Sequence, residues 1–361
     1  MIRFIYSLIF IAAVVACNSD KKEKTRLPKA TGKPGDILLF MDSVQWNGSL
    51  GDEVRNVFLA DMPGLPQQEP MFKLIWVHPT NGRTMLTQLR NLVYVFTLDQ
   101  QTSGSKSLRR NFSPETLAQI KNDSSFYLST QTDEYSKGQH VMYLFGNTEE
   151  DLIRHLKKQK QSIIDYFNVV ERNRQHDDLL KTGSTKGISA FLRNEQQCEI
   201  HVPIGYRLAD KRDDFVWFRD ITSTTDEDIF ISWKKYTDQS QFSKDSLVAW
   251  RDEIAKKYLY EDPSNPISYL VTEQKHAEVL ARPMKLNGHY TVELRGLWHT
   301  NNHTMGGPFL SYTLIDEGRG LLYYIEGFAY APGRDKREIM RQLETILSTF
   351  KMSDEIKVST K

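Results

Sequence analysis

Four strand-like segments follow one another between residues 279 and 331, and this run most restricts the folds open to the chain. Apolar and polar residues alternate over 279–284, 290–298, 309–315 and 321–331, a pattern that predicts an antiparallel meander. The next segment, 334–350, has a helical period, with Ile339, Leu343, Ile346 and Leu347 on one stripe. An apolar sheet face and an apolar helix stripe must cover each other. We therefore expect helices packed on an antiparallel sheet in this part of the chain.

The earlier part of the chain has the same kinds of element in a different order. Strands are predicted over 36–41, 71–77, 92–98, 126–131 and 140–145, and short helices over 49–58 and 84–90. Ser49 with Asp52, and Thr148 with Asp151, have the spacing of a capping box, and the second pair begins a long helix. The predicted fold is α+β with two subdomains, each a mainly antiparallel sheet with packed helices. The second half is strand-rich and ends in an amphipathic helix.

The first residues have the pattern of an export signal. Arg3 precedes an uncharged, almost wholly apolar run over 4–15, which is shorter than the about 20 residues that a bilayer span needs. That length is typical of a signal peptide. Val14-Val15-Ala16-Cys17 fits the recognition site of the lipoprotein signal peptidase, so we expect a signal peptide over 1–16 and lipidation at Cys17. An uncleaved signal anchor, or a secreted protein with an incidental Cys17, is the alternative.

A lipidated Cys17 implies a membrane partner. Each buried CH₂ contributes about 0.8 kcal/mol, so the two or three acyl chains of a lipoprotein anchor it stably where one chain would not. The polar residues 17–34 are then a flexible tether. The predicted location is the cell envelope, lipid-anchored in the outer membrane, on either its periplasmic face or the cell surface.

Composition excludes one class of partner and suggests two domains. Removing Arg3 with the signal peptide leaves 46 basic residues (47 − 1) against 46 acidic ones, so no basic excess exists to neutralise the phosphates of a nucleic acid. The small and polar residues Gly183-Ser184-Thr185-Lys186-Gly187 form the best candidate linker. We therefore expect an N-terminal α+β domain over 35–182 and a C-terminal α+β domain over 188–352.

Cys198 is the second of only two cysteines. With Cys17 committed to lipid, Cys198 has no partner for an intramolecular disulfide. It begins the alternating segment 198–202, which predicts a strand and a buried structural thiol.

The segment between Glu293 and Phe309 contains the candidate binding residues. Glu293 and Arg295 share one face of a predicted strand, where they can pair with each other or grip an anion. Trp298 lies on the opposite face, and the chain then runs through His299, His303, Gly306 and Gly307. Two interpretations remain open. A hairpin with a Gly-Gly-Pro turn, a structural Glu–Arg pair and a packed tryptophan explains the pattern without a ligand; the alternative is a ligand-contacting loop at a sheet edge.

No metal or cofactor is predicted, and no catalytic residue is assigned. His299 and His303 would share a face on a helix, as a zinc site requires, but Asn301-Asn302 and Gly306-Gly307 argue against a helix there. The sequence has neither a Gly-x-Ser-x-Gly elbow nor a phosphate-binding Gly-x-x-x-x-Gly-Lys.

Several strings resemble one family. They are Pro34-Gly35-Asp36-Ile37, Asp61-Met62-Pro63-Gly64-Leu65-Pro66-Gln67, the run from Tyr290 to Trp298, Met305-Gly306-Gly307-Pro308-Phe309, and the run from Ile325 to Gly333 with Lys336-Arg337. Together they resemble the Bacteroidetes lipoproteins known as domain of unknown function 4837, over about Pro34 to Phe350. The resemblance implies an envelope setting and no particular activity.

Three functions compete on this basis. The first is a non-enzymatic binding or scaffold module, with an envelope protein or a glycan as partner. The second is an envelope hydrolase with its site near the strand and loop from Glu293 to Gly307. A deep pocket that brings together Glu293, Arg295 and His299 would favour this enzyme. The third is a small-molecule or lipid carrier, which needs a large apolar cavity between sheet and helices.

Overall fold

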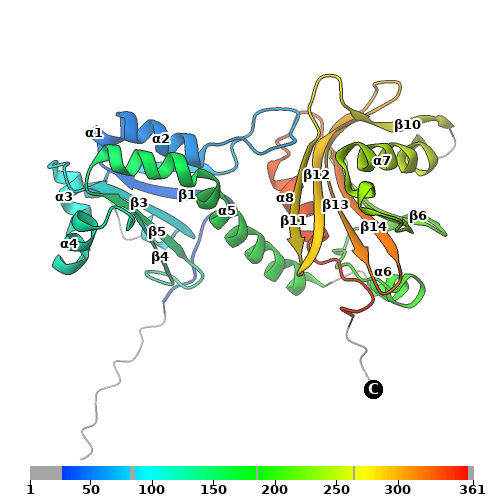
Figure 1. Cartoon of the computed structure of the whole chain (residues 1–361), viewed down its shortest axis with the longest axis horizontal. Helices are drawn as coiled ribbons and strands as arrows, with labels where there is room; N and C mark the ends of the chain where they lie inside the picture. The colour runs from blue at the N-terminus through cyan, green and yellow to red at the C-terminus, as the bar shows by residue number, and fades with distance from the viewer. Residues whose placement is uncertain (1–26, 82–85, 184–185, 263–264, 357–361) are drawn as a thin grey trace, which may run out of the picture.

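The chain has two halves joined by a long helix, as its computed structural model shows (Figure 1). The structure describes residues 27–81, 86–183, 186–262 and 265–356. The signal peptide, Cys17 and the first ten residues of the expected tether lie outside these ranges. The described residues form one five-stranded and one nine-stranded sheet. The α+β class is confirmed, and so is the strand-rich second half that ends in a helix.

The first sheet has the strand order β2-β1-β3-β5-β4. Its pairs β1–β2, β1–β3 and β3–β5 are parallel, and only β4–β5 is antiparallel. This pairing differs from the mainly antiparallel sheet that we expected here. The first-half strands can run parallel because connections that contain helices carry the chain back to the end of the sheet where the preceding strand began. The strands are β1 (Asp36–Met41), β2 (Lys73–Val77), β3 (Asn91–Thr97), β4 (Leu128–Thr132) and β5 (His140–Gly146).

Helices cover both faces of this sheet. One core lies between alternate residues of β1, β3 and β5 and the helices α2 and α5, and a second core lies on the opposite face with α3 and α4. Thr148 caps α5 by accepting from the backbone N–H of Asp151, as expected, and Ser113 caps α4 by accepting from the backbone N–H of Thr116. The helices are α1 (Ser43–Trp46), α2 (Ser49–Phe58), α3 (Ser103–Arg109), α4 (Pro114–Asn122) and α5 (Glu149–Thr182).

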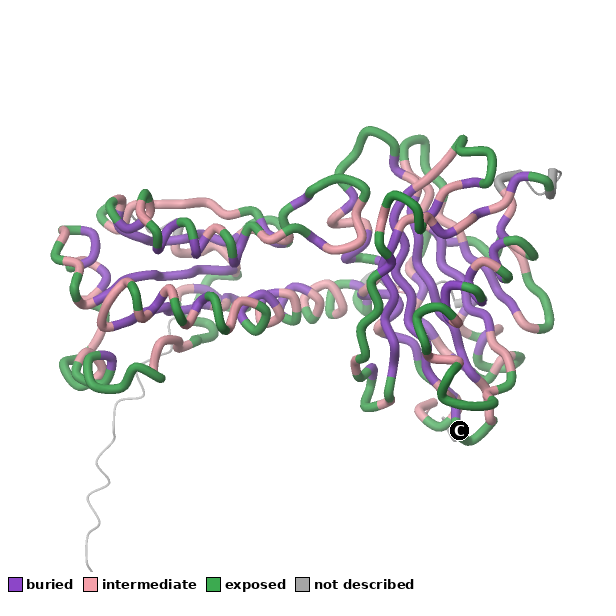
Figure 2. The backbone as a smooth tube through the Cα atoms, turned by 45° about the horizontal axis from the view of Figure 1, so that its top comes forward, coloured by how far each residue is buried: buried purple, intermediate pink, exposed green. Residues whose placement is uncertain are grey.

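The second sheet is antiparallel along the order β6-β7-β8-β14-β13-β12-β10-β9, and β11 also pairs with β12. Its buried strands run through the middle of the second half (Figure 2). The strands are β6 (Arg207–Arg212), β7 (Phe215–Ile221), β8 (Asp226–Lys235), β9 (Tyr260–Asp262), β10 (Asn265–Glu273), β11 (Leu280–Leu286), β12 (His289–Thr300), β13 (Gly306–Asp316) and β14 (Leu321–Tyr330).

The two faces of the second sheet pack on different helices. Helix α7 (Lys244–Tyr258) shares a core with one face, and α8 (Arg337–Leu347) shares a core with the other. The short helix α6 (Lys186–Phe191) and a π-helical turn (Leu192–Gln196) lie near the α8 face. The predicted meander and closing helix are thus confirmed.

Three local predictions were wrong in detail. Helix α2 has Gly48 as its N-cap and no side-chain cap, because Ser49 is already inside the helix. The short helix expected over 84–90 is a 3₁₀ turn at Leu86–Gln88, and part of that range lies outside the described residues. Segment 198–202 alternates in burial as expected, but it forms only a bridge between Glu199 and Lys351.

Cys198 is fully buried, and burial raises the pKa of its thiol to about 12.

Two segments connect the halves. The second part of α5 runs toward α8, and the loop between α2 and β2 reaches the N-terminal end of α8 (Figure 1). The expected linker is described only at Gly183, Lys186 and Gly187. Within the described residues, no helix has both the length and the apolar character that crossing a membrane requires.

Candidate functional site: a cavity between the two halves

The predicted site residues lie in three separate places. Glu293 and Arg295 line a cavity between the halves, whereas Trp298 lines a smaller cavity on the opposite face of the second sheet. His299 and His303 lie at the end of the β12–β13 hairpin. The structure therefore does not bring Glu293, Arg295 and His299 into one pocket.

The larger cavity has a volume of about 600 Å³, and both halves contribute its walls. Helix α5 and the α2–β2 loop line it from the first half, and β11, β12 and α8 line it from the second. Apolar side chains face the cavity, and two of them remain well exposed, Val169 at 41% and Leu280 at 40%. Such a concave site of mixed polarity has the size and character of a small-molecule pocket.

Arg295 forms the centre of the charged groups in this cavity. Its Nη2 lies 2.8 Å from Glu344 Oε2 and 3.1 Å from Glu293 Oε2. Arg172 Nη1 lies 3.2 Å from Glu344 Oε1, and Arg282 Nη2 lies 3.3 Å from Glu293 Oε1. The carboxylates are thus held between a buried central guanidinium and two outer ones, whose side chains are 31% and 54% exposed for Arg172 and Arg282.

Opposite charges keep these buried groups ionised. Burial alone would lower the pKa of Arg295, but the carboxylates of Glu344 and Glu293 overcome this effect and raise it. Burial alone would raise the pKa of Glu344, but Arg295 and Arg172 hold it below its usual value. Both groups therefore stay charged at neutral pH, as fixed charges rather than as a proton donor and acceptor.

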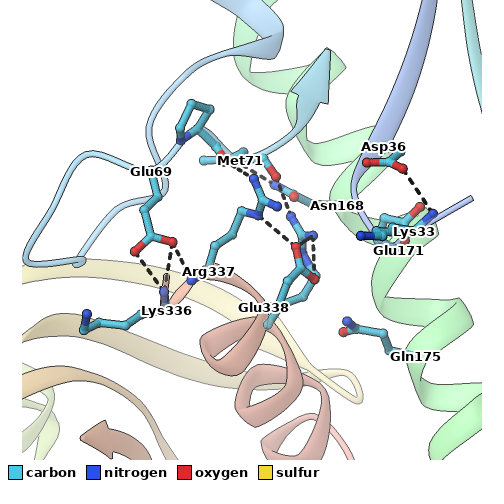
Figure 3. Close-up of polar contacts among 12 residues, drawn as sticks. Lys33, Asp36, Glu69, Met71, Asn168, Glu171, Gln175, Lys336, Arg337 and Glu338 are labelled. Carbon is cyan, nitrogen blue, oxygen red and sulfur yellow. Dashed lines mark hydrogen bonds and ion pairs between the residues drawn. The ribbon is translucent and has the colours of Figure 1, made fainter. Parts of the chain in front are cut away.

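The two walls of the cavity are tied together beside α8 (Figure 3). Both carboxylate oxygens of Glu69 accept from the backbone N–H of Lys336, each at 2.9 Å, and one also accepts from Arg337 N–H at 2.8 Å. Arg337 Nη1 donates to Pro70 O at 2.9 Å, and Arg341 Nη2 donates to Met71 O at 2.7 Å. These bonds fix the α2–β2 loop against the first turns of α8 and so hold two walls of the cavity in one arrangement.

The glycines of the predicted loop lie inside β13 and not in a turn. Gly306 pairs with His299 and Gly307 with Trp298, and the connection itself spans 301–305. A Cβ on Gly307 would lie 2.0 Å from Ala329 O, which explains the need for glycine there. Because β12 and β13 lie inside the sheet order, the 301–305 connection of the second interpretation does not lie at a sheet edge, and the Gly-Gly-Pro turn of the first interpretation is part of a strand.

The histidines make local contacts. The rings of His299 and His303 stack with centroids 4.4 Å apart, and His299 Nε2 lies 3.7 Å from Glu273 Oε2. Among the described residues, one group of three has potential metal-ligating atoms within 4.8 Å of one another, namely His289, Asp354 and Glu355. Neither predicted site histidine belongs to it.

Sequence reasoning missed most of the cavity. Arg172 belongs to α5, Arg282 to β11, and Arg341 and Glu344 to α8, so no sequence spacing connects the residues of one element with those of another. The sequence offered one signal for Glu69, namely an acidic residue inside a Pro/Gly loop. The structure buries this residue, at 7% exposed.

Two family models match the chain, one for each half. Residues 186–349 match the model described as domain of unknown function DUF4837, and residues 30–179 match that of domain of unknown function DUF8532. The first family therefore covers the second half alone, whereas we expected it to extend back to Pro34. The chain is built from domains of unknown function.

The chain is only weakly similar to solved structures. The chain has 9% sequence identity to the Saccharomyces cerevisiae Ran-binding protein Mog1p, with a TM-score of 0.31, over 44% of this chain and 92% of that one. A Pseudomonas aeruginosa protein of unknown function titled a putative regulator, PA94, has 14% identity and a TM-score of 0.25, over 40% of this chain and 94% of that one. No curated protein matches the chain.

Proposed function

We propose that this protein is a non-enzymatic binding module of the cell envelope, tethered by lipid on Cys17, that holds an amphiphilic anion between its two halves. The observation that carries the binding role is the cavity of about 600 Å³ with guanidinium groups and exposed apolar side chains on its walls. The leader before Cys17 supports the tether.

The charges of the cavity favour an anionic ligand. Arg172, Arg282, Arg295 and Arg341 face three carboxylates, those of Asp165, Glu293 and Glu344, in its lining. Arg172 and Arg282 each use one Nη atom toward a carboxylate and are partly exposed, so donors on both remain open to a ligand. Guanidinium groups suit carboxylates and phosphates because their donors form a planar fork.

The apolar part of the lining favours a ligand with a hydrocarbon portion. Val169 and Leu280 are exposed to the cavity from opposite walls, and Met71 and Met284 lie beside it. Methionine side chains adapt to irregular apolar ligands. The proposal therefore combines two of the expected functions, the binding module and the small-molecule or lipid carrier. It places the ligand between the two halves, whereas the carrier hypothesis expected a cavity between sheet and helices.

The permanently charged groups of the larger cavity favour a binding site over the active site of a hydrolase. An acid–base pair needs a group whose pKa lies near the working pH. In the cavity the pKa of Glu344 is lowered and that of Arg295 is raised, so both shifts run away from neutrality. His299, which the enzyme hypothesis required, lies at the hairpin end.

The binding role can be tested on the mature chain with Cys17→Ser, using decanoate as probe below its micelle concentration. We expect decanoate to raise the melting temperature, because a ligand that binds only the folded state stabilises it. Decanol, without the charge, and inorganic phosphate, without the tail, should have a smaller effect. Arg172→Ala and Arg282→Ala should each weaken decanoate binding by about fivefold to tenfold.

Arg154→Ala is the matched control, because Arg154 is an exposed α5 arginine paired with Asp151 outside the cavity. It should leave decanoate binding unchanged. Equal binding by the cavity variants and the control, or no binding of decanoate at all, would contradict the proposed site.

The tether is tested separately by mass spectrometry of the N-terminal peptide from the native membrane fraction. We expect Cys17 to begin the mature chain with acyl chains attached, and Cys17→Ser to be released from the membrane. An unmodified thiol or another mature N-terminus would refute the tether and leave the cavity proposal intact.

A further inference from the structure

The segment that follows α8 is fixed against one end of the second sheet. The side chains of Phe350 and Met352 are buried, at 0% and 1% exposed. Phe350 O accepts from Asn287 Nδ2 at 2.9 Å, and Ser353 Oγ donates to Asp316 Oδ2 at 2.9 Å. This segment therefore lies beside the turn between β11 and β12 (Figure 1), and none of its residues lines either cavity.

Three potential metal ligands meet at this place. His289, Asp354 and Glu355 each offer one nitrogen or oxygen atom, and these atoms all lie within 4.8 Å of one another. His289 Nε2 and Glu355 Oε2 are 3.8 Å apart, and the two side chains are 31% and 19% exposed. Asp354 is exposed as well. A dissolved ion can therefore reach all three groups.

The backbone holds two of these side chains in place. Glu355 Oε2 accepts from the backbone N–H of Met352 at 3.0 Å, and the Glu355 N–H donates to Met352 O at 3.1 Å. His289 is the first residue of β12 and follows a tight turn, in which Asn287 and Gly288 have φ of +51° and +91°. Contacts that orient the ligands in this way strengthen a metal site.

The two carboxylates have no basic side chain of the protein beside them. Within the described ranges, the only ion pair of Asp354 or Glu355 is the 3.8 Å contact with His289, whose imidazole is charged only when it is protonated. A divalent cation would balance both negative charges. The neutral imidazole could then offer its nitrogen lone pair to the same ion.

We propose that His289, Asp354 and Glu355 bind a divalent transition-metal ion, with Zn²⁺ as the best fit. An imidazole ligand favours Zn²⁺ over Ca²⁺ and Mg²⁺, which prefer oxygen ligands in larger numbers. Zn–N and Zn–O bonds of about 2.0–2.2 Å place the ligand atoms of a tetrahedral site about 3.4 Å apart. The 3.8 Å pair therefore needs to close only slightly. Three protein ligands leave a fourth position for water.

The ion would join the segment after α8 to the β11–β12 turn. Asp354 and Glu355 follow α8, whereas His289 opens the strand that also carries Glu293 and Arg295. Metal binding would stabilise the second half, because the ligands come from distant parts of the chain and meet only in the folded state. This site is separate from the larger cavity, so it goes beyond the function proposed above.

The test uses the mature chain with Cys17→Ser, without an affinity tag and freed of metal by a chelator. We expect Zn²⁺ at about ten times its dissociation constant to raise the melting temperature by about 3 °C. Co²⁺ should bind at the same place and show the visible absorption of a tetrahedral complex. Isothermal titration calorimetry should show that His289→Ala and Asp354→Asn each weaken Zn²⁺ binding by about tenfold or more. Asp354→Asn keeps the size of an exposed side chain, so the fold should persist.

His299→Ala is the matched control. His299 Nε2 also lies near a carboxylate, 3.7 Å from Glu273 Oε2, but His299 belongs to no group of three potential ligands among the described residues. Its loss should leave Zn²⁺ binding unchanged. No Zn²⁺ binding up to millimolar concentration, equal binding by Asp354→Asn and wild type, tighter binding of Ca²⁺ than of Zn²⁺, or loss of Zn²⁺ binding in His299→Ala would overturn the proposal. None of these results bears on decanoate binding in the larger cavity.

Discussion

A single residue, Gly64, allows the α2–β2 loop to lie against the second sheet. Gly64 has φ of +78°, and a Cβ built on it would lie 2.9 Å from Arg295 Cβ and 3.3 Å from Gly296 N. The loop therefore touches the strand that carries the buried Arg295, and only a glycine allows both the backbone conformation and the contact.

Gly64→Ala should destabilise the protein by about 2–4 kcal/mol, because it combines a strained positive φ with a clash against β12. Gly138→Ala is the control, since Gly138 has φ of +81° with nothing within 4 Å of a Cβ. It should cost only about 1 kcal/mol. Urea denaturation of both variants measures the difference, and equal losses would show that the contact with Arg295 is unimportant.

Asp228 makes stability depend on pH. Burial raises the pKa of its carboxyl to about 7, although Arg219 and Trp217 oppose the shift. The folded state therefore holds a proton that the unfolded state has released above its ordinary pKa. Stability from this group is fully present below the unfolded pKa, and it is lost as pH rises through about 7.

Asp228→Asn should remove this dependence. Between about pH 5 and about pH 7, the free energy of unfolding of the wild type should fall relative to that of the variant by roughly 2–3 kcal/mol. Urea denaturation of both proteins across this range gives the difference. A difference that stays constant with pH would mean that the Asp228 carboxyl is already ionised throughout.

At the scale of elements, a buried ion pair fixes α7 on the second sheet. Arg251 of α7 is fully buried, and its Nε and Nη2 lie 2.9 Å and 2.8 Å from the two carboxylate oxygens of Glu326 in β14. Its Nη1 donates to Thr272 in β10 at 3.0 Å, and its guanidinium lies 4.0 Å from the centre of the Phe309 ring. One side chain thus joins the helix to three strands.

Arg251→Met should therefore destabilise the protein by about 3–5 kcal/mol, because it leaves the Glu326 carboxylate buried without its partner. Lys181→Met is the comparison, since the Lys181–Asp178 pair is 73% and 69% exposed and should contribute about 0–1 kcal/mol. Thermal and urea unfolding report both values. A loss of less than about 1 kcal/mol for Arg251→Met would show that the neighbouring polar groups compensate for the missing arginine.

At the scale of the whole molecule, the two halves are held in one arrangement by the contacts around α8. Glu69 accepts three backbone hydrogen bonds at the start of this helix, where its negative charge also favours the helix dipole. Leu179, at the end of α5, packs in the same core as α8. The cavity between the halves depends on these contacts, because they hold its walls at a fixed distance from each other.

Glu69→Ala should reduce the free energy of unfolding by about 2–3 kcal/mol and loosen both the α2–β2 loop and the first turn of α8. Hydrogen exchange should increase in these two segments together and should change little in β3. Glu69→Gln keeps an acceptor oxygen and should lose less, and Glu115→Ala, at the exposed first turn of α4, should be nearly neutral. Faster exchange in only one of the two segments would argue against a shared cap.

The sequence by itself determined the local elements of this protein. The alternation in β11–β14, the stripe of α8 and the cap Thr148 depend on neighbouring residues, so they were predictable. The unbroken apolar run of β1, buried on both faces, also indicated a parallel sheet covered on both sides.

Tertiary structure alone decided the pairing of strands that lie far apart in the sequence, the placement of the halves and the two cavities. Glu293 and Arg295 share a strand face, so their pairing was predictable from a period of two residues. Their partners Glu344 and Arg282 come from α8 and β11, and Arg172, which pairs with Glu344, comes from α5. Nothing in the sequence spacing specifies which of many charged residues will meet, because such contacts form only when packed elements bring distant parts of the chain together.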